Sequence, residues 1–350
     1  MKRDIATLEQ LSELSSFDQI IDVRSPGEFA EDHIPGSINC PVLDNQQRIE
    51  VGTLYKQASP FAAKKLGAAY VSTNIAKHLQ TQFFDCPKSW RPLIVCWRGG
   101  QRSGAMTYVF RRVGWDALQL EGGYKAYRRL VVEDLAERPR KLQFKVLCGA
   151  TGSAKSRILQ AIGRRGEQVL DLEELACHKG SVLGVLPDSA QPSQKMFESQ
   201  LLTALRALDP NRPIYVEAES RKIGSLQVPA ALIETMRGGE CFTIEASFAA
   251  RVDFLLRDYD YFLLAPARLN ACLHPLRTLQ SAETLLRWQG YVRDAQWREL
   301  VSELLELHYD PLYSRSQTRN YGGFAAPARF TSDDLTPVGV EALALEICGG

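Results

Sequence analysis

Apolar and polar positions alternate along this chain in a way that predicts strands followed by amphipathic helices. Short apolar runs bounded by turn-forming residues are typical of strands. Such runs lie at residues 19–23, 93–96, 142–148, 168–171 and 213–217, and residues 33–39 and 118–124 are each predicted to contain a short strand and a turn. After the run at 93–96, apolar residues recur at helical spacing at Met106, Val109, Phe110 and Val113. Strands that alternate with such helices favour an α/β fold built on parallel sheets.

The last part of the chain, from about Ala265 onward, shows a mainly helical pattern. Leucine and aromatic residues recur there at helical spacing, namely Leu285, Leu286, Trp288, Tyr291, Val292, Leu300, Val301, Leu304 and Leu305. We interpret these positions as core packing between helices and not as a cofactor site. Residues 44–80 are also mostly helical in pattern. They form either part of a substrate entrance or a covering surface helix.

Length and composition narrow the class of protein. A chain of 350 residues is long enough for two domains. No apolar run approaches the ~18 residues that a membrane-spanning helix needs, and the first residues lack the apolar core of a signal peptide. Eight scattered cysteines without a C-x-x-C pair argue against a zinc site and against a disulfide framework. We therefore expect a cytoplasmic protein with no membrane partner.

Charge is distributed unevenly along the chain, although the net charge is only +1. Between Pro87 and Arg165 there are 17 lysines and arginines but only 5 acidic residues. This segment either forms a face that binds a polyanion or is a solvated surface with acidic neighbours in space.

The apolar run at 93–96 ends in Cys96, and a loop rich in glycine and arginine follows. Amide groups of such a loop and of the next helix N-terminus point at one spot, where they favour the nucleophilic thiolate. We expect Cys96 to be an exposed catalytic nucleophile, with Arg102 holding an anion over the sulfur. The residues predicted to surround that anion are Arg98, Gly99, Gly100, Gln101, Arg102 and Ser103. The alternative is a buried, inert cysteine that ends a strand.

A second glycine-rich loop follows the predicted strand at 142–148 and precedes a helical pattern. This is the context of a phosphate-binding loop, in which backbone N–H groups wrap a diphosphate. The residues predicted to bind the diphosphate are Gly149, Thr151, Gly152, Ser153, Lys155 and Ser156. Ala154 stands where the motif G-x-x-x-x-G-K-[ST] has its second glycine, so its methyl group could crowd a phosphate. The alternative is a degenerate structural turn.

Metal binding is predicted only in connection with this loop. The Ser156 hydroxyl can ligate Mg²⁺, and no tightly bound cofactor is expected. Asp171 and Glu217 each end a predicted strand, where a carboxylate can assist a metal or a water molecule. Glu217 is equally well explained as an ordinary loop carboxylate.

The first part of the chain resembles a rhodanese domain. The motifs that carry this resemblance are IDVRSPGEF at 21–29, HIPGSIN at 33–39, Cys96 with its loop, and LEGGY at 120–124. The resemblance covers about residues 8–135 and implies that Cys96 carries sulfur or a related chalcogen, while Asp22 and Arg24 are structural. The loop from Cys96 to Arg102 is one residue longer than the usual sulfurtransferase loop, which suits a larger, phosphate-like anion. A P-loop domain with a mainly helical C-terminal part then occupies residues 141–350.

The order of the two domains resembles the tRNA 2-selenouridine synthase family. Further motifs support this, namely VGTLYKQ at 51–57, EGGYKA at 121–126, DLE at 171–173, HKGS at 178–181, EAESRKIG at 217–224 and HYDPLY at 308–313. Ala154 and Ser156 depart from the glycine and threonine that the family commonly has.

The resemblance implies a tRNA-modifying transferase that converts wobble 2-thiouridine to 2-selenouridine. It implies an S-geranyl intermediate made from geranyl diphosphate at the P-loop, then selenophosphate at Cys96. The partners would be the tRNA anticodon stem-loop, whose wobble base could stack on Trp97 or Tyr124, and an enzyme that supplies selenophosphate. Two alternatives remain: a rhodanese-type sulfurtransferase with an ATP-binding accessory domain, and a non-enzymatic RNA-binding protein with decayed sites.

Overall fold

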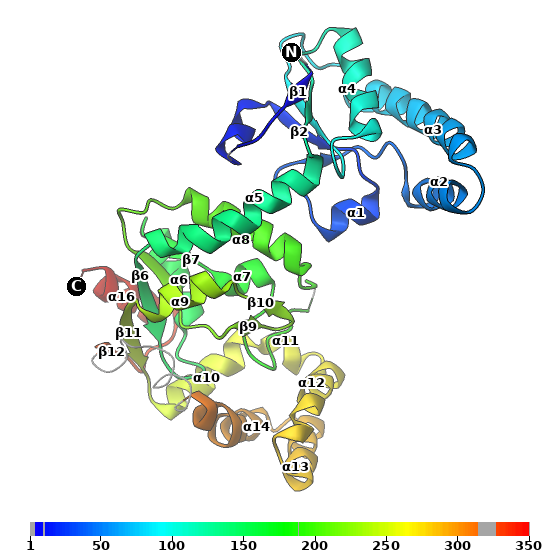
Figure 1. The fold of residues 1–350 in the computed structure, drawn as a ribbon. Coiled ribbons are helices and arrows are strands. Elements are labelled where there is room, and N and C mark those ends of the chain that lie inside the picture. Colours follow the sequence, from blue (N-terminus) through cyan, green and yellow to red (C-terminus); the bar gives the residue numbers. More distant parts are fainter. Residues whose placement is uncertain (1–3, 10, 188, 314–326, 350) are drawn as a thin grey trace. The chain divides into compact units, whose positions relative to one another are not determined.

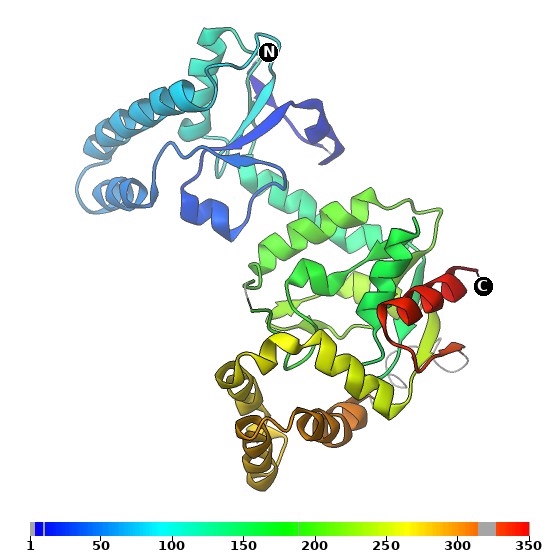
Figure 2. The ribbon, with the colours of Figure 1, turned by 180° about the vertical axis from the view of Figure 1, so that it is seen from behind.

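A computed structural model describes residues 4–9, 11–187, 189–313 and 327–349 (Figures 1 and 2). The chain forms two compact units. The first unit comprises Met1–Asp134 and Ser193–Thr203, and the second comprises Leu135–Pro192 and Ala204–Gly350. Within the described residues, no helix combines the length and the apolar character that crossing a membrane requires.

The first unit is built on a sheet of five parallel strands in the order β1-β5-β4-β2-β3. The strands are β1 (Ile5–Ala6), β2 (Gln19–Asp22), β3 (Ile38–Asn39), β4 (Pro92–Val95) and β5 (Leu118–Leu120). All four residues of the central strand β4 are buried, as its uninterrupted apolar sequence predicts. The strands predicted at 19–23 and 93–96 are thereby confirmed to within one residue or two, and the strand predicted within 118–124 is confirmed as β5.

Helices connect and cover these strands (Figure 1). They are η1 (Leu11–Ser16), α1 (Pro26–Glu31), α2 (Asn45–Gln57), α3 (Pro60–Thr81) and α4 (Gln101–Val113). Helices α5 (Gly123–Glu137) and α8 (Gln194–Ala207) begin in this unit and end in the second. Helix α1 begins as the sequence predicts, because Ser25 and Glu28 form a capping box before Pro26. The predicted helical insertion consists of α2 and α3, and Ile75 of α3 packs into the core of this unit.

A cluster of aromatic rings forms part of that core beneath β4. The rings of Phe83, Trp90, Phe110 and Trp115 lie with centroids 5.1 to 5.8 Å apart, mostly edge to face. Cys96 belongs to the same buried cluster. The residue that follows the central strand is therefore held by rigid packing.

Asp22 and Arg24 form a buried ion pair at the end of β2. Both side chains are 1% exposed, and Arg24 Nη2 lies 2.6 Å from Asp22 Oδ2. The same nitrogen donates a hydrogen bond to the carbonyl oxygen of Asp32 at 2.6 Å. The side-chain amide of Asn39 donates hydrogen bonds to the backbone carbonyl oxygens of both residues, which fixes their positions. The two residues therefore act as structural groups, as the rhodanese resemblance implies.

The second unit contains another sheet of five parallel strands, in the order β12-β11-β6-β8-β7. Its strands are β6 (Phe144–Cys148), β7 (Gln168–Leu170), β8 (Ile214–Glu217), β11 (Glu240–Glu245) and β12 (Ala328–Thr331). A two-stranded antiparallel hairpin consists of β9 (Lys222–Ile223) and β10 (Leu226–Gln227). The edge strand β12 buries only Phe330, so no apolar run in the sequence predicts it.

The helices of this unit form two groups. Those beside the sheet are η2 (Arg138–Lys141), α6 (Lys155–Arg164), α7 (Leu172–Ala176), α9 (Ala230–Arg237) and α16 (Pro337–Gly349). Helices α6 and α16 pack together against the sheet in one apolar core (Figure 2). The second group is α10 (Phe248–Asp258), α11 (Asp260–Leu263), α12 (Pro266–Leu273), η3 (His274–Thr278), α13 (Ala282–Arg293), α14 (Trp297–Leu304) and η4 (Leu305–Tyr309).

This second group, the helical part, has a core of its own around Trp288 and Leu300. The predicted helical pattern after Ala265 is confirmed, with β12 as an interruption. Together the two units give the predicted fold class: a rhodanese-like parallel-sheet domain and a P-loop α/β domain with a mainly helical C-terminal part.

We predict that Asp22→Ala destabilises the first unit by about 3–5 kcal/mol, because it leaves the buried Arg24 guanidinium without its counter-charge. Hydrogen exchange of β2 and β4 peptides measures this free energy of opening. Asp116→Ala is the matched control, because it breaks an ion pair with Arg91 at the surface, where Asp116 is 60% exposed. The control should cost less than about 1 kcal/mol. Equal effects of the two variants would contradict a structural role for Asp22.

Candidate active sites

Cys96 directly follows the central strand β4 and lies at the N-terminal end of α4. Its sulfur accepts hydrogen bonds from the Gly100 N–H at 3.2 Å and from the Ser103 hydroxyl at 3.0 Å. Gly100 is also the N-cap residue of α4, so the positive end of that helix is close to the sulfur. Both donors stabilise negative charge on sulfur. The arrangement suits a nucleophile, but the expected exposure is wrong: Cys96 is only 3% exposed, because its side chain packs into the core.

Two glycines allow the loop after Cys96 to lie against the turn between β5 and α5. Gly99 and Gly123 both have positive φ values, of 62° and 58°. A Cβ atom at Gly123 would lie 2.2 Å from the Cys96 carbonyl oxygen, and one at Gly99 would lie 2.4 Å from that of Leu120. The Tyr124 N–H completes the contact by donating to the Cys96 carbonyl oxygen at 2.8 Å. The turn between β5 and α5 therefore holds the loop in place.

Arg102 does not lie alone above the sulfur. Its Nη1 donates a hydrogen bond to Glu28 Oε2 at 2.9 Å, and Arg48 binds the same oxygen at 2.9 Å. Burial raises the pKa of Glu28, but the two arginines outweigh it and hold that pKa below its usual value. An anion at this loop would therefore compete with Glu28 for Arg102. Of the other predicted residues, Arg98 and Gln101 are exposed on the loop.

Trp97 and Tyr124 stack on each other beside the cysteine, with centroids 5.4 Å apart. The Arg24 guanidinium also lies over the Tyr124 ring, 4.0 Å from its centroid. Tyr124 is 2% exposed, so its predicted role as a stacking surface for a base is wrong. Trp97 is 37% exposed and keeps a surface on which a base could stack.

The second candidate site is the loop between β6 and α6. Lys155 Nζ donates hydrogen bonds to the carbonyl oxygens of Gly149 at 2.9 Å and Ala150 at 3.3 Å, which holds the lysine across the loop. Ala154 adopts the left-handed conformation, with φ 59° and ψ 22°. It therefore takes the backbone conformation that the motif's glycine would have, and it belongs to the buried apolar cluster with Leu147 and Ile158.

Three carboxyl groups lie close to this loop. Ser156 donates to Glu173 Oε2 at 3.1 Å, and Glu217 at the end of β8 is 6% exposed with no hydrogen-bond partner for its Oε1. Burial and the neighbouring carboxylates raise the pKa of Glu173 to about 9 and that of Glu219 to about 8. A carboxyl group that is buried away from water either keeps its proton or binds a cation.

Asp171 caps a helix, and its predicted assistance to a metal or a water molecule stays a prediction. Its Oδ1 accepts the N–H of Glu174 at 2.8 Å, so Asp171 is the N-cap of α7. Glu173, two residues later, faces the loop instead. Sequence reasoning missed Glu173 and Glu219, although both lie one turn or less beyond predicted strand ends within the motifs DLE and EAE. Among the described residues, no group of three or more His, Cys, Asp or Glu side chains is arranged to hold a metal ion.

A cavity of about 400 Å³ opens in front of the P-loop and the three glutamates. The motifs HKGS and HYDPLY also line it, through Lys179 and Tyr309 among others. Lys179 Nζ pairs with Asp258 at 2.6 Å and lies over the Tyr259 ring. Arg251 ties the P-loop to the second motif, since it donates to the Thr151 carbonyl oxygen and pairs with Asp310. Sequence motifs far apart along the chain thus converge on one cavity.

Many basic residues between 87 and 165 have acidic partners. The paired residues are Arg91, Arg102, Arg111, Arg128, Arg129, Arg140, Arg157, Arg164 and Arg165. These pairs reduce the positive charge that the segment offers to a polyanion. The structure therefore favours the interpretation that much of this charge is balanced by neighbours in space.

Comparisons with known proteins agree with both halves of this description. Residues 6–130 match the family model of the rhodanese-like domain, and residues 142–271 match that of the "tRNA 2-selenouridine synthase AAA domain". A tRNA 2-selenouridine synthase of Nitrosomonas europaea is 34% identical over 77% of this chain and 71% of its own length. The protein with the same name from Alcanivorax borkumensis is 32% identical over 90% of this chain and 94% of its own.

We predict that Ala154→Gly costs less stability than Ala161→Gly in the second unit. Both substitutions remove one methyl group from the same buried cluster. Of the two residues, only Ala154 has a left-handed backbone, and glycine adopts that conformation without the strain of about 1–2 kcal/mol that a Cβ atom causes. Hydrogen exchange of β6 and α6 peptides in the two variants measures the difference. Equal losses would show that Ala154 is not strained.

Proposed function

The chain belongs to the tRNA 2-selenouridine synthase family, and on this premise we propose how its two sites carry out the reaction. As a member of that family it is a tRNA-modifying enzyme of the transferase class. The proposal is that wobble 2-thiouridine of tRNA is first S-geranylated from geranyl diphosphate and then converted to 2-selenouridine with selenophosphate. The pairing of an anion-binding cysteine loop with a P-loop in one chain is the observation that carries this proposal.

The P-loop site is proposed to perform geranyl transfer. The sulfur of 2-thiouridine attacks C1 of the geranyl group, the C–O bond breaks, and diphosphate leaves with the bonding electrons. Lys155 lies across the loop, where its ammonium group would stabilise the charge that develops on the diphosphate. Geranylation matters chemically because it makes the sulfur a good leaving group for the second step.

A magnesium ion bound mainly through the diphosphate would need only one or two of the oxygens around the P-loop. Ser156, Glu173 and Glu217 offer the oxygen ligands that Mg²⁺ prefers, and Glu217 Oε1 is buried without a partner. When bound, the ion would neutralise charge on the diphosphate. Glu219 lies beside this set and is also buried. The protein's own part is to hold these oxygens close to Lys155.

The cysteine loop is proposed to handle selenium. The selenium atom of selenophosphate forms a bond to C2 of the geranylated base, the C2–S bond breaks, and geranylthiol leaves. Water then attacks phosphorus, the P–Se bond breaks, and phosphate leaves, so that selenium stays on the base. Cys96 is assigned as the chalcogen-carrying nucleophile, and Gly100 and Ser103 stabilise its charge. Selenophosphate would occupy the wide loop, with Arg98 and Arg102 near its phosphate, and a separate enzyme would supply it. The exposed face of Trp97 is the remaining candidate to stack the unpaired wobble base.

We expect Cys96→Ser to abolish selenium incorporation while leaving geranylation and tRNA binding intact, because serine is a far weaker nucleophile at neutral pH. Mass spectrometry of the nucleosides from treated tRNA measures both products. Cys86→Ser, which changes a half-buried cysteine of the same unit away from the loop, serves as control and should retain activity. Selenouridine made by the Cys96 variant would remove this cysteine from the mechanism.

We expect Lys155→Ala to reduce geranyl transfer by about 100-fold or more, since a positive group at the leaving diphosphate is lost. The same assay with geranyl diphosphate alone shows the loss. Lys141→Ala removes an exposed lysine of the same unit and should have little effect. Unchanged geranylation in the Lys155 variant would exclude the P-loop, and thiosulfate sulfurtransferase activity above any tRNA reaction would favour a plain sulfurtransferase.

A further inference from the structure

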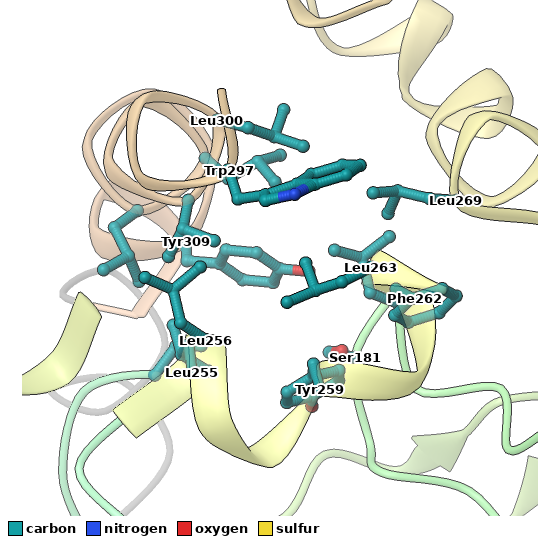
Figure 3. A pocket seen from close by; sticks show the side chains of 15 residues that line it. Ser181, Leu255, Leu256, Tyr259, Phe262, Leu263, Leu269, Trp297, Leu300 and Tyr309 are labelled. Carbon is teal, nitrogen blue, oxygen red and sulfur yellow. The ribbon is translucent and has the colours of Figure 1, made fainter. Parts of the chain in front are cut away.

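The helical part of the second unit encloses an apolar pocket that the proposed chemistry has not used (Figure 3). The cavity volume is about 60 Å³, so the pocket is narrow and suits a slender group better than a bulky one. Eleven of its fifteen lining residues are Leu, Val, Phe or Trp. Leu263 of α11 and Trp297 and Leu300 of α14 project into it from different helices (Figure 3).

This apolar pocket shares part of its wall with the cavity in front of the P-loop. Both are lined by Thr151 of the P-loop itself and by Ser181, Leu255, Tyr259 and Tyr309. A ligand whose anionic end is held at Lys155 can therefore extend its other end between the helices. The sequence interpretation of this part as core packing alone is thus incomplete, since the same leucines also form the wall of a pocket.

Three of the hydroxyl groups in the wall are already paired with one another. The hydroxyls of Tyr259 and Tyr309 both hydrogen-bond Ser181. Burial raises the pKa of Tyr309 to about 12, so this hydroxyl stays neutral. A nucleotide base would lose its hydrogen bonds to water in such a pocket and find few partners in return. A hydrocarbon chain makes no hydrogen bonds to water that burial could break, and the removal of its apolar surface from water is favourable.

We propose that this pocket, which we call the tail pocket, binds the hydrocarbon chain of a prenyl diphosphate whose diphosphate lies on the P-loop. The walls formed by Leu263, Trp297 and Leu300 limit the length of the chain that fits. This inference rests on the proposed function, which requires a prenyl diphosphate at the P-loop. It adds the site that distinguishes such a donor from inorganic diphosphate or a nucleotide.

Isothermal titration of the full chain with inorganic diphosphate and with dimethylallyl, geranyl and farnesyl diphosphates tests the tail pocket. The wild-type protein should bind geranyl diphosphate about tenfold or more tightly than inorganic diphosphate, because the chain is buried. Leu263→Trp, which fills the pocket, should weaken the binding of geranyl diphosphate by about tenfold or more. The same variant should change the affinity for inorganic diphosphate by less than about twofold. Leu264→Trp is the matched control, since Leu264 is 88% exposed and lies outside the pocket.

A second variant acts in the opposite direction and protects the test against misfolding. Trp297→Ala enlarges the pocket and should raise the affinity for farnesyl relative to geranyl diphosphate several-fold. Retained binding of inorganic diphosphate shows that a variant is folded. Two results would overturn the tail pocket but not the P-loop site. One is that Leu263→Trp and the wild type bind geranyl diphosphate with equal affinity, and the other is that the affinity of the wild type does not rise with the length of the prenyl chain. Failure of the wild type to bind any of the diphosphates would instead contradict the proposed function.

Discussion

A helix that begins directly after a parallel strand concentrates unbonded N–H groups at one point, and this chain uses that arrangement twice. In the first unit α4 begins beside Cys96, where Gly100 and Ser103 donate to the sulfur. In the second unit α6 begins at Lys155, after a loop that bends around the lysine. Both loops thus begin a helix at the carboxyl end of a parallel strand, and different side chains surround the two helix starts, Cys96 at one and Lys155 at the other.

The geometry at both positions depends on close packing behind the loop. At Cys96 this support comes from Gly99 and Gly123, where a Cβ atom would collide with carbonyl oxygens of the opposite turn. At the P-loop, Arg251 holds Thr151 from behind and links it to Asp310. Ala154 shows how far the loop can depart from the usual motif: its backbone keeps the left-handed conformation while its side chain is buried. The cost is local strain at Ala154.

Local signals made much of this predictable from sequence. Apolar runs located β2, β4, β6 and β8, and the glycine-rich segments after β4 and β6 located the two loops. Long-range packing decided the rest. Nothing near Arg102 in sequence indicates that Glu28 pairs with it, and the core that buries Cys96 comes from many segments between Ile21 and Ala117. Asp171 and Glu173 are both carboxylates after a strand, and only the start of α7 decides which caps the helix and which faces Ser156.

Both sites must act on one RNA base, in a fixed order, for this account to hold. The most direct test follows the nucleosides of a 2-thiouridine-containing tRNA by mass spectrometry while the substrates are added in turn to the wild-type protein. The account predicts that geranyl diphosphate alone produces S-geranyl-2-thiouridine, that selenophosphate then converts it to 2-selenouridine, and that selenophosphate alone converts nothing. Formation of 2-selenouridine at the full rate without geranyl diphosphate would contradict it.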